Sequence, residues 1–62
     1  MSYDLKLAEE ICDKLYEIAY RMNESEEKFV TQTRERFEQY GGRTYLSQKQ
    51  FDWLVELETK YL

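Results

Sequence analysis

Residues 40–62 read YGGRTYLSQKQFDWLVELETKYL, and they predict a helix end, a loop and a new helix, in that order. The glycine pair 41–42 supplies the left-handed backbone conformation with which many helices end. Ser47 and Gln50 have the spacing of a capping box, in which each side chain accepts a hydrogen bond from the other residue's backbone N–H. We therefore expect a helix over 48–62, and this boundary is the best signalled one in the chain.

Two further stretches repeat apolar residues at steps of three and four, which is typical of helices. The first covers about 3–22 and has Ser2 as its expected N-cap. The second covers 24–40, begins with a capping box of Asn23 and Glu26, and ends at the glycine pair. Because neither Gly nor Pro separates the two stretches, one long helix is the alternative.

Three amphipathic helices predict an all-α fold, a small antiparallel three-helix bundle that forms one domain over 1–62, with 41–46 as its clearest loop. The first and third helices have wide apolar faces, whereas the middle helix has a narrow one. A monomer would then leave apolar area uncovered. The alternative is a long helix plus a shorter one, forming a helical hairpin that dimerises. Trp53 fits either a core or an interface position.

The composition sets limits on stability and location. The chain has 62 residues, with 9 Lys+Arg against 13 Asp+Glu, one Cys, no His and a net charge of −4. A chain of this length buries only about 60% of its unfolded surface, so we expect self-association or a partner protein to add stability. No apolar run reaches the roughly 20 residues of a membrane span, and no signal-peptide pattern is present. We expect a cytoplasmic protein without a membrane partner.

Catalytic and metal chemistry are not indicated. Without His, a nucleophile or a general base near neutral pH would rest on a carboxylate, a tyrosine or Cys12. Cys12 falls on the apolar face of the first helix, where burial raises the pKa of a thiol. No second Cys, metal-ligand cluster or Gly-rich phosphate loop accompanies it. We expect a non-enzymatic protein that holds no cofactor and no metal.

The first candidate site is a surface for a partner protein. Glu9, Asp13 and Glu17 stand four residues apart and line up on the outer face of the first helix. Tyr16 and Tyr20 fall at the edge of its apolar face, and tyrosine is a common anchor in interfaces. This acidic strip predicts docking on a basic protein surface. An ordinary solvated helix face is the alternative.

The second candidate site would bind nucleic acid. Cations and aromatic side chains alternate around the glycine pair, and this combination holds phosphates and stacks unpaired bases. Two glutamates interleave with the arginines, and the net charge is negative, which both argue against this function. The residues concerned are Arg34, Arg36, Arg43, Tyr45 and Lys49.

The segment 36–54, RFEQYGGRTYLSQKQFDWL, resembles small helical accessory proteins and terminal modules of bacteriophages, in which an RFEQYGxRTxLSxKQxxWL pattern links one helix to the next. The resemblance implies a phage-encoded protein that acts in the cytoplasm of the infected host, near DNA processing, host takeover or anti-defence. It transfers no catalytic residue. We therefore expect an interaction protein that inhibits or adapts a host or phage protein, with nucleic-acid binding as the alternative.

Overall fold

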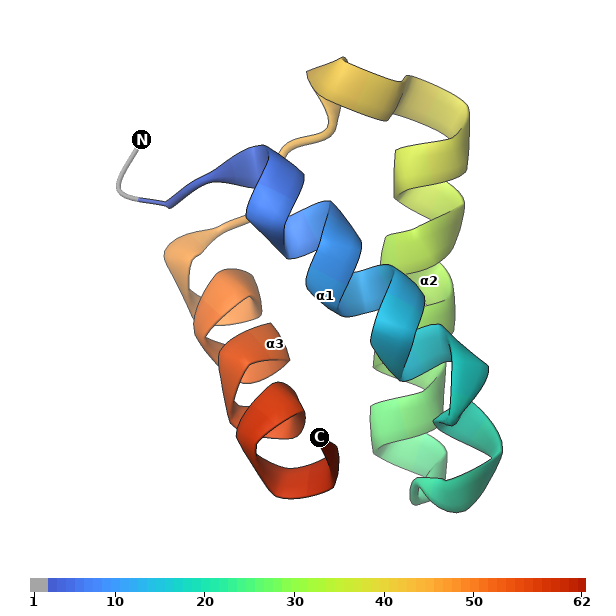
Figure 1. The fold of residues 1–62 in the computed structure, drawn as a ribbon. Coiled ribbons are helices and arrows are strands. Elements are labelled where there is room, and N and C mark those ends of the chain that lie inside the picture. The colour runs from blue at the N-terminus through green and yellow to red at the C-terminus, as the bar shows by residue number, and fades with distance from the viewer. Residues whose placement is uncertain (1–2) are drawn as a thin grey trace.

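The computed structural model describes residues 3–62, which form helices connected by short turns (Figure 1). The α-helices are α1 (Leu5–Glu17), α2 (Glu24–Tyr40) and α3 (Gln48–Tyr61). Two single turns of 3₁₀ helix connect them: η1 (Ala19–Arg21) and η2 (Gly41–Arg43). The described residues contain no strand. The predicted all-α fold, a small three-helix bundle, is confirmed.

The start of α1 differs from the prediction. Asp4 is the N-cap, and its Oδ1 accepts hydrogen bonds from the backbone N–H groups of Lys6 at 2.9 Å and Leu7 at 3.4 Å. The helix therefore begins at Leu5 rather than at residue 3. The predicted N-cap, Ser2, lies outside the described residues.

The end of α1 corrects the predicted helix over 3–22. The α-helix stops at Glu17, and the chain continues through η1. A 3₁₀ helix has three residues per turn, so η1 keeps Ala19 buried while Met22 still packs against the core. The apolar spacing that predicted a longer α-helix is thus satisfied by a tighter turn. Met22 and Asn23 are then extended, with ψ angles of 163° and 169°, which excludes one continuous helix.

The boundaries of α2 and the start of α3 are confirmed. Asn23 Oδ1 accepts from the N–H of Glu26 at 2.8 Å, and Glu26 Oε1 accepts from the N–H of Asn23 at 3.3 Å. Ser47 Oγ and Gln50 Oε1 make the same reciprocal pair, at 3.1 and 2.8 Å. Gly41 ends α2 with φ 54° and ψ −125°. This positive φ suits glycine, although the ψ angle is that of a tight turn and not of a left-handed helix.

The core is centred on α1, which contacts both other helices. In Figure 1, α1 lies between the other two helices and crosses in front of α2, and α2 runs in the opposite direction to both α1 and α3. None of the helices within residues 3–62 has the length and apolar character needed to cross a bilayer. Apolar side chains remain exposed on α1 and α3, as the wide faces of these helices predict: Leu7 on α1, Val55 on α3 and Leu62 directly after α3. The core residues are Ala8, Ile11, Cys12, Leu15, Val30, Phe37, Leu46, Leu54 and Leu57.

Side-chain contacts join α2 to α3 in a region that we call the α2–α3 seam. Its residues are Glu26, Phe29, Trp53, Lys60 and Tyr61. The rings of Phe29 and Trp53 are stacked, with centroids 4.1 Å apart and planes inclined by 19°. Beside them, Glu26 accepts hydrogen bonds from the Tyr61 hydroxyl at 2.6 Å and from Lys60 Nζ at 3.0 Å. Trp53 therefore packs at the edge of the core. The hydrogen bond from Tyr61 and then that from Lys60 lower the pKa of the Glu26 carboxyl.

Candidate nucleic-acid interface

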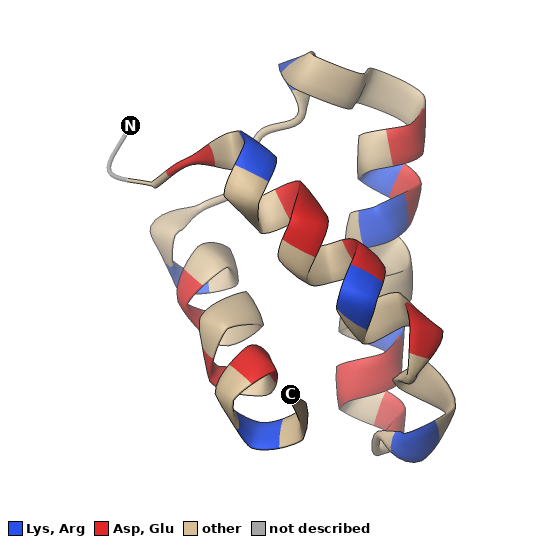
Figure 2. Cartoon of the chain, viewed as in Figure 1, with Lys and Arg blue, Asp and Glu red and all other residues tan. Residues whose placement is uncertain are grey.

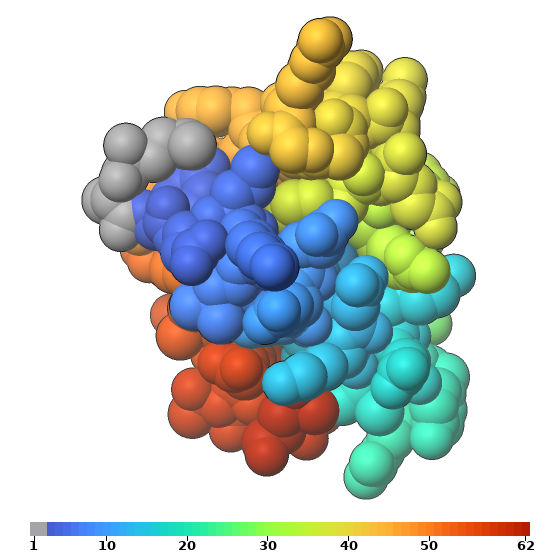
Figure 3. Space-filling model, turned by 45° about the horizontal axis from the view of Figure 1, so that its top comes forward, coloured from blue at the N-terminus to red at the C-terminus, as the bar shows by residue number. Residues whose placement is uncertain are grey.

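A surface pocket lies where the chain leaves α2. Arg36 and Tyr40 are four residues apart on α2 and so share one face of the helix. The turn η2 then folds the chain back, which brings Arg43, Thr44 and Tyr45 to the same place. These five residues line a hollow of about 360 Å³, which we call the arginine–tyrosine pocket. In Figure 3 the segment that follows α2 lies beside the first turn of α1 on one face of the molecule.

Thr44 fixes the wall of this pocket. Its side chain is buried, and its Oγ1 lies 2.8 Å from the carbonyl oxygen of Gly41 and 3.2 Å from that of Arg36, so the hydroxyl proton is shared between them. The Thr44 N–H donates to the Gly41 carbonyl at 3.1 Å, and the Gly41 N–H donates to the carbonyl of Phe37. The carbonyl groups of Arg36, Phe37 and Gly41 thus accept hydrogen bonds from the backbone and side chain of the turn itself.

Tyr3, near the N-terminus, holds the backbone of Leu46, which follows the pocket residues in the chain. The Tyr3 hydroxyl donates to the carbonyl of Leu46 and accepts from its N–H at 2.9 Å, while the Tyr3 ring stacks on Phe51 with centroids 4.9 Å apart. Leu46 and Thr44 are 1% and 4% exposed. Tyr45 lies between them and is 70% exposed. Its backbone is therefore anchored on both sides while its ring faces solvent.

The charge of the pocket is positive and uncompensated by direct contacts. Within residues 3–62, no salt bridge involves Arg36 or Arg43. The C-terminal end of α2 carries a partial negative charge that disfavours an anion by about 0.3–1 kcal/mol. Arg36 and Arg43 are exposed, and an exposed ion pair contributes about 0.2–1 kcal/mol, so two guanidinium groups together offset the effect of the helix end. The pocket favours an anionic ligand.

Arg34 does not belong to the candidate nucleic-acid site to which the sequence assigns it. Its Nη1 lies 3.6 Å from Asp13 Oδ1 on α1 and 3.2 Å from Glu38 Oε1 on α2. Its guanidinium carbon sits 4.6 Å above the centre of the Tyr16 ring. The side chain is two-thirds buried by these contacts. Arg34 thus connects α1 to α2 and does not line the pocket.

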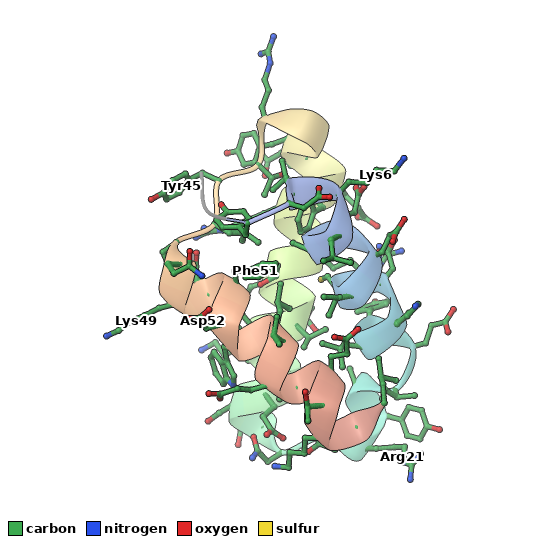
Figure 4. The ribbon with its side chains drawn as sticks, turned by 60° about the vertical axis from the view of Figure 1, so that its left-hand side comes forward. Lys6, Arg21, Tyr45, Lys49, Phe51 and Asp52 are labelled. Atoms are coloured by element: carbon green, nitrogen blue, oxygen red, sulfur yellow. The ribbon has the colours of Figure 1, made fainter. Side chains whose placement is uncertain are left out.

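The structure joins three of the five residues predicted to bind nucleic acid: Arg36, Arg43 and Tyr45. Lys49 lies outside the pocket, in the first turn of α3, and points away from the molecule on the same side as Tyr45 (Figure 4). Tyr40 and Thr44 were absent from the predicted set. The four-residue spacing from Arg36 to Tyr40 could have identified Tyr40, whereas the anchoring role of Thr44 depends on the turn geometry.

The acidic strip on α1 is less uniform than its spacing predicts. Figure 2 shows basic residues interspersed with acidic ones along α1 and α2. Asp13 contacts Arg34, and Glu9 is half-buried and borders a second hollow, between α1 and the end of α2. Glu17 is exposed at the last residue of α1. The two predicted tyrosine anchors are exposed as well, Tyr16 at 44% and Tyr20 at 77%.

Cys12 is in the core and is poorly suited to act as a nucleophile. Its side chain is fully buried, and Sγ lies 3.7 Å from the carbonyl oxygen of Val30, to which the thiol donates. Burial, with a smaller contribution from Asp13, raises the pKa of the thiol to about 12. Among residues 3–62, no group of three or more Cys, Asp or Glu side chains is arranged to hold a metal ion.

Comparison of the chain with protein-family models, with curated proteins and with solved structures finds no significant match. The phage resemblance of residues 36–54 stays a prediction from the sequence pattern. The function is therefore inferred from the geometry of the arginine–tyrosine pocket.

Proposed function

We propose that this protein binds nucleic acid through the arginine–tyrosine pocket. The observation that supports the proposal is the meeting, in one hollow, of two largely exposed tyrosines and two arginines that form no ion pair within the described residues 3–62. Guanidinium groups are well matched to phosphate oxygens because they offer several N–H donors in one plane. Aromatic rings add contacts to bases or sugars. A pocket of about 360 Å³ is within the range of about 300–1,000 Å³ found for small-ligand sites.

The glutamates that interleave with these arginines in the sequence do not cancel the charge of the pocket. Neighbouring residues on a helix point in directions about 100° apart. Glu38 is held by Arg34, on the side of α2 that meets α1. Glu35 is exposed but does not line the pocket. Sequence proximity therefore overstates the effect of these carboxylates on a bound phosphate.

Fluorescence anisotropy with labelled single- and double-stranded oligonucleotides tests the proposal. Two guanidinium contacts to a single strand predict that log K falls with log salt with a slope of about −1.4, or about sevenfold between about 50 and 200 mM salt. Arg36→Gln combined with Arg43→Gln should abolish most of this dependence. Arg21→Gln, at the opposite end of the molecule (Figure 4), is the matched control. Absence of binding at low salt, or binding unchanged in the double variant, would refute the proposal.

A second candidate function is binding of a partner protein at α1. The observation that favours it is the exposure of Tyr16, Glu17 and Tyr20 where α1 ends and η1 follows, with the partly exposed Glu9 further back on α1. Tyrosine is enriched among the residues that contribute most to binding at protein interfaces. A phage-encoded inhibitor or adaptor acting in the host cytoplasm, as a monomer or a homodimer, would use such a surface. This function and the pocket occupy different parts of the molecule.

The test of this second function avoids Asp13, because a substitution there would also release Arg34 from its ion pair. Glu9→Lys combined with Glu17→Lys reverses the charge of the strip, and Tyr20→Ala removes the more exposed anchor. Loss of capture of a partner from host extract, with an unchanged helical circular dichroism spectrum, would support the α1 surface. Capture by both variants at the level of the unmodified protein would eliminate it.

A further inference from the structure

The two tyrosine rings of the pocket are largely exposed and carry no stacked partner among the described residues. Tyr45 and Tyr40 are 70% and 53% exposed. Within residues 3–62, neither ring takes part in an aromatic stack or a cation–π contact. Other tyrosines are engaged, since Tyr3 stacks on Phe51 and Tyr16 lies under a guanidinium. The pocket therefore concentrates ring area that the fold does not use.

The backbone on both sides of Tyr45 is held in place while the ring stays exposed. Residues on either side of it are almost fully buried, and the backbone of Leu46 is fixed through both its N–H and its C=O by the Tyr3 hydroxyl. A ring on a fixed backbone loses little conformational entropy when it binds a flat ligand, since only two side-chain torsions remain to be ordered. The fold thus presents Tyr45 as a preorganised stacking platform.

A stacking platform distinguishes single-stranded from double-stranded nucleic acid. In a duplex the faces of the bases are covered by neighbouring base pairs, and a protein reaches only the phosphates and the groove edges. In a single strand the bases can unstack and lie on aromatic side chains. Two arginines alone would bind either form through phosphates, so the tyrosines favour the single strand.

We infer that the arginine–tyrosine pocket holds an unpaired nucleotide of a single strand, with its phosphate on Arg36 and Arg43 and its base stacked on Tyr45. This inference rests on the proposed function and specifies its ligand. Tyr40 lines the same hollow and offers a second ring. Lys49, which points outward on the side of Tyr45 (Figure 4), lies where the strand could continue to a further phosphate.

The experiment compares four labelled probes at low salt: a single-stranded oligothymidine, an abasic oligonucleotide of equal length, a DNA duplex and inorganic polyphosphate. The first probe should bind most tightly, since only it combines phosphates with accessible bases. Loss of one stacked base lowers affinity by about 5- to 150-fold in other proteins. The affinity of Tyr45→Ala for oligothymidine should be lower by a factor in this range. Its affinity for the abasic probe should equal that of the unmodified protein.

Two control variants separate stacking from folding and from general surface effects. Tyr45→Phe keeps the ring and should bind oligothymidine within about threefold of the unmodified protein, because the stacking face is retained. Tyr20→Ala removes a tyrosine that is 77% exposed on η1 and should have no effect. Circular dichroism verifies that each variant is folded.

The possible results distinguish the inference from the proposed function. Equal affinity for oligothymidine, the abasic probe and polyphosphate, with Tyr45→Ala indistinguishable from the unmodified protein, would overturn base stacking and leave phosphate binding in place. Tighter binding of the duplex would overturn the single-strand preference. Failure of all four probes to bind would refute the proposed function itself, and the second candidate function, protein binding at α1, would take its place.

Discussion

Phe29→Ala tests whether the α2–α3 seam stabilises the bundle. Phe29 is partly buried, so removing its ring forfeits the lower part of the roughly 1.5–3 kcal/mol assigned to a fully buried side chain. The stack on Trp53, with centroids 4.1 Å apart, adds about 0.5–1.5 kcal/mol. Alanine returns about 0.5 kcal/mol through its higher helix propensity. The net loss is about 1.5–3 kcal/mol, against a total of about 3–9 kcal/mol for a chain of this length.

Urea denaturation gives the measurement, because Trp53 is the chain's one tryptophan and reports on its own surroundings. With a slope near 1 kcal/mol per molar urea, the midpoint should fall by about 1.5–3 M. The native emission of Trp53 should also shift to the red as water reaches the exposed ring face. Phe29→Leu keeps apolar contact and should lose only the stacking contribution of about 0.5–1.5 kcal/mol. A midpoint and an emission maximum unchanged in Phe29→Ala would show that the stack does not stabilise the fold.

Three further predictions concern the carboxyl of the seam, the turn and the thiol. Because hydrogen bonds from Tyr61 and Lys60 lower the pKa of Glu26, their contribution to stability is complete above the ordinary carboxyl pKa of about 4.3 and is lost as pH falls through the lowered value. Urea midpoints measured from neutral to acidic pH should therefore fall more for the unmodified protein than for Glu26→Gln, and parallel curves would contradict this. Gly41→Ala should cost about 1–3 kcal/mol in urea unfolding because of its φ of 54°. Gly42→Ala, where a Cβ meets no atom within 4 Å, should leave stability unchanged or raise it by up to about 1 kcal/mol, and equal effects of the two changes would refute the strain at the first glycine. Cys12 should react with a thiol reagent only after unfolding, and fast reaction of the native protein would disprove its burial.

The helix boundaries that depend on local hydrogen bonds were predictable from sequence. The capping boxes at Asn23 and Ser47 involve residues three positions apart, and the structure contains both. The first helix was predicted too long, because an apolar step of three residues fits an α-helix and a 3₁₀ turn alike. Only the need to reverse the chain before α2 selects the turn at Ala19–Arg21, and that need arises from tertiary packing.

The pocket was predictable in part for the same reason. Arg36, Arg43 and Tyr45 were grouped because they flank one short loop, and the fold keeps them together. The ion pair of Arg34 with Asp13 joins two helices, and no local pattern in the sequence marks it. The contact of Tyr3 with Leu46 spans 43 positions in the chain. No local sequence pattern predicts such a contact, so the anchoring of the loop was not predictable from the sequence either.

The net charge of −4 weighs less against nucleic-acid binding than it does when the sequence is considered alone. A net charge sums over the whole surface, whereas exposed charges act on a ligand over a screening length of about 8 Å at physiological salt. Within that range, the ion pairs that each arginine forms affect a bound phosphate more than the net charge of the chain does. Arg34 is committed to Asp13 and Glu38, while Arg36 and Arg43 form no salt bridge within residues 3–62. The ion pairs of the fold, rather than the composition, thus set where a phosphate would be attracted.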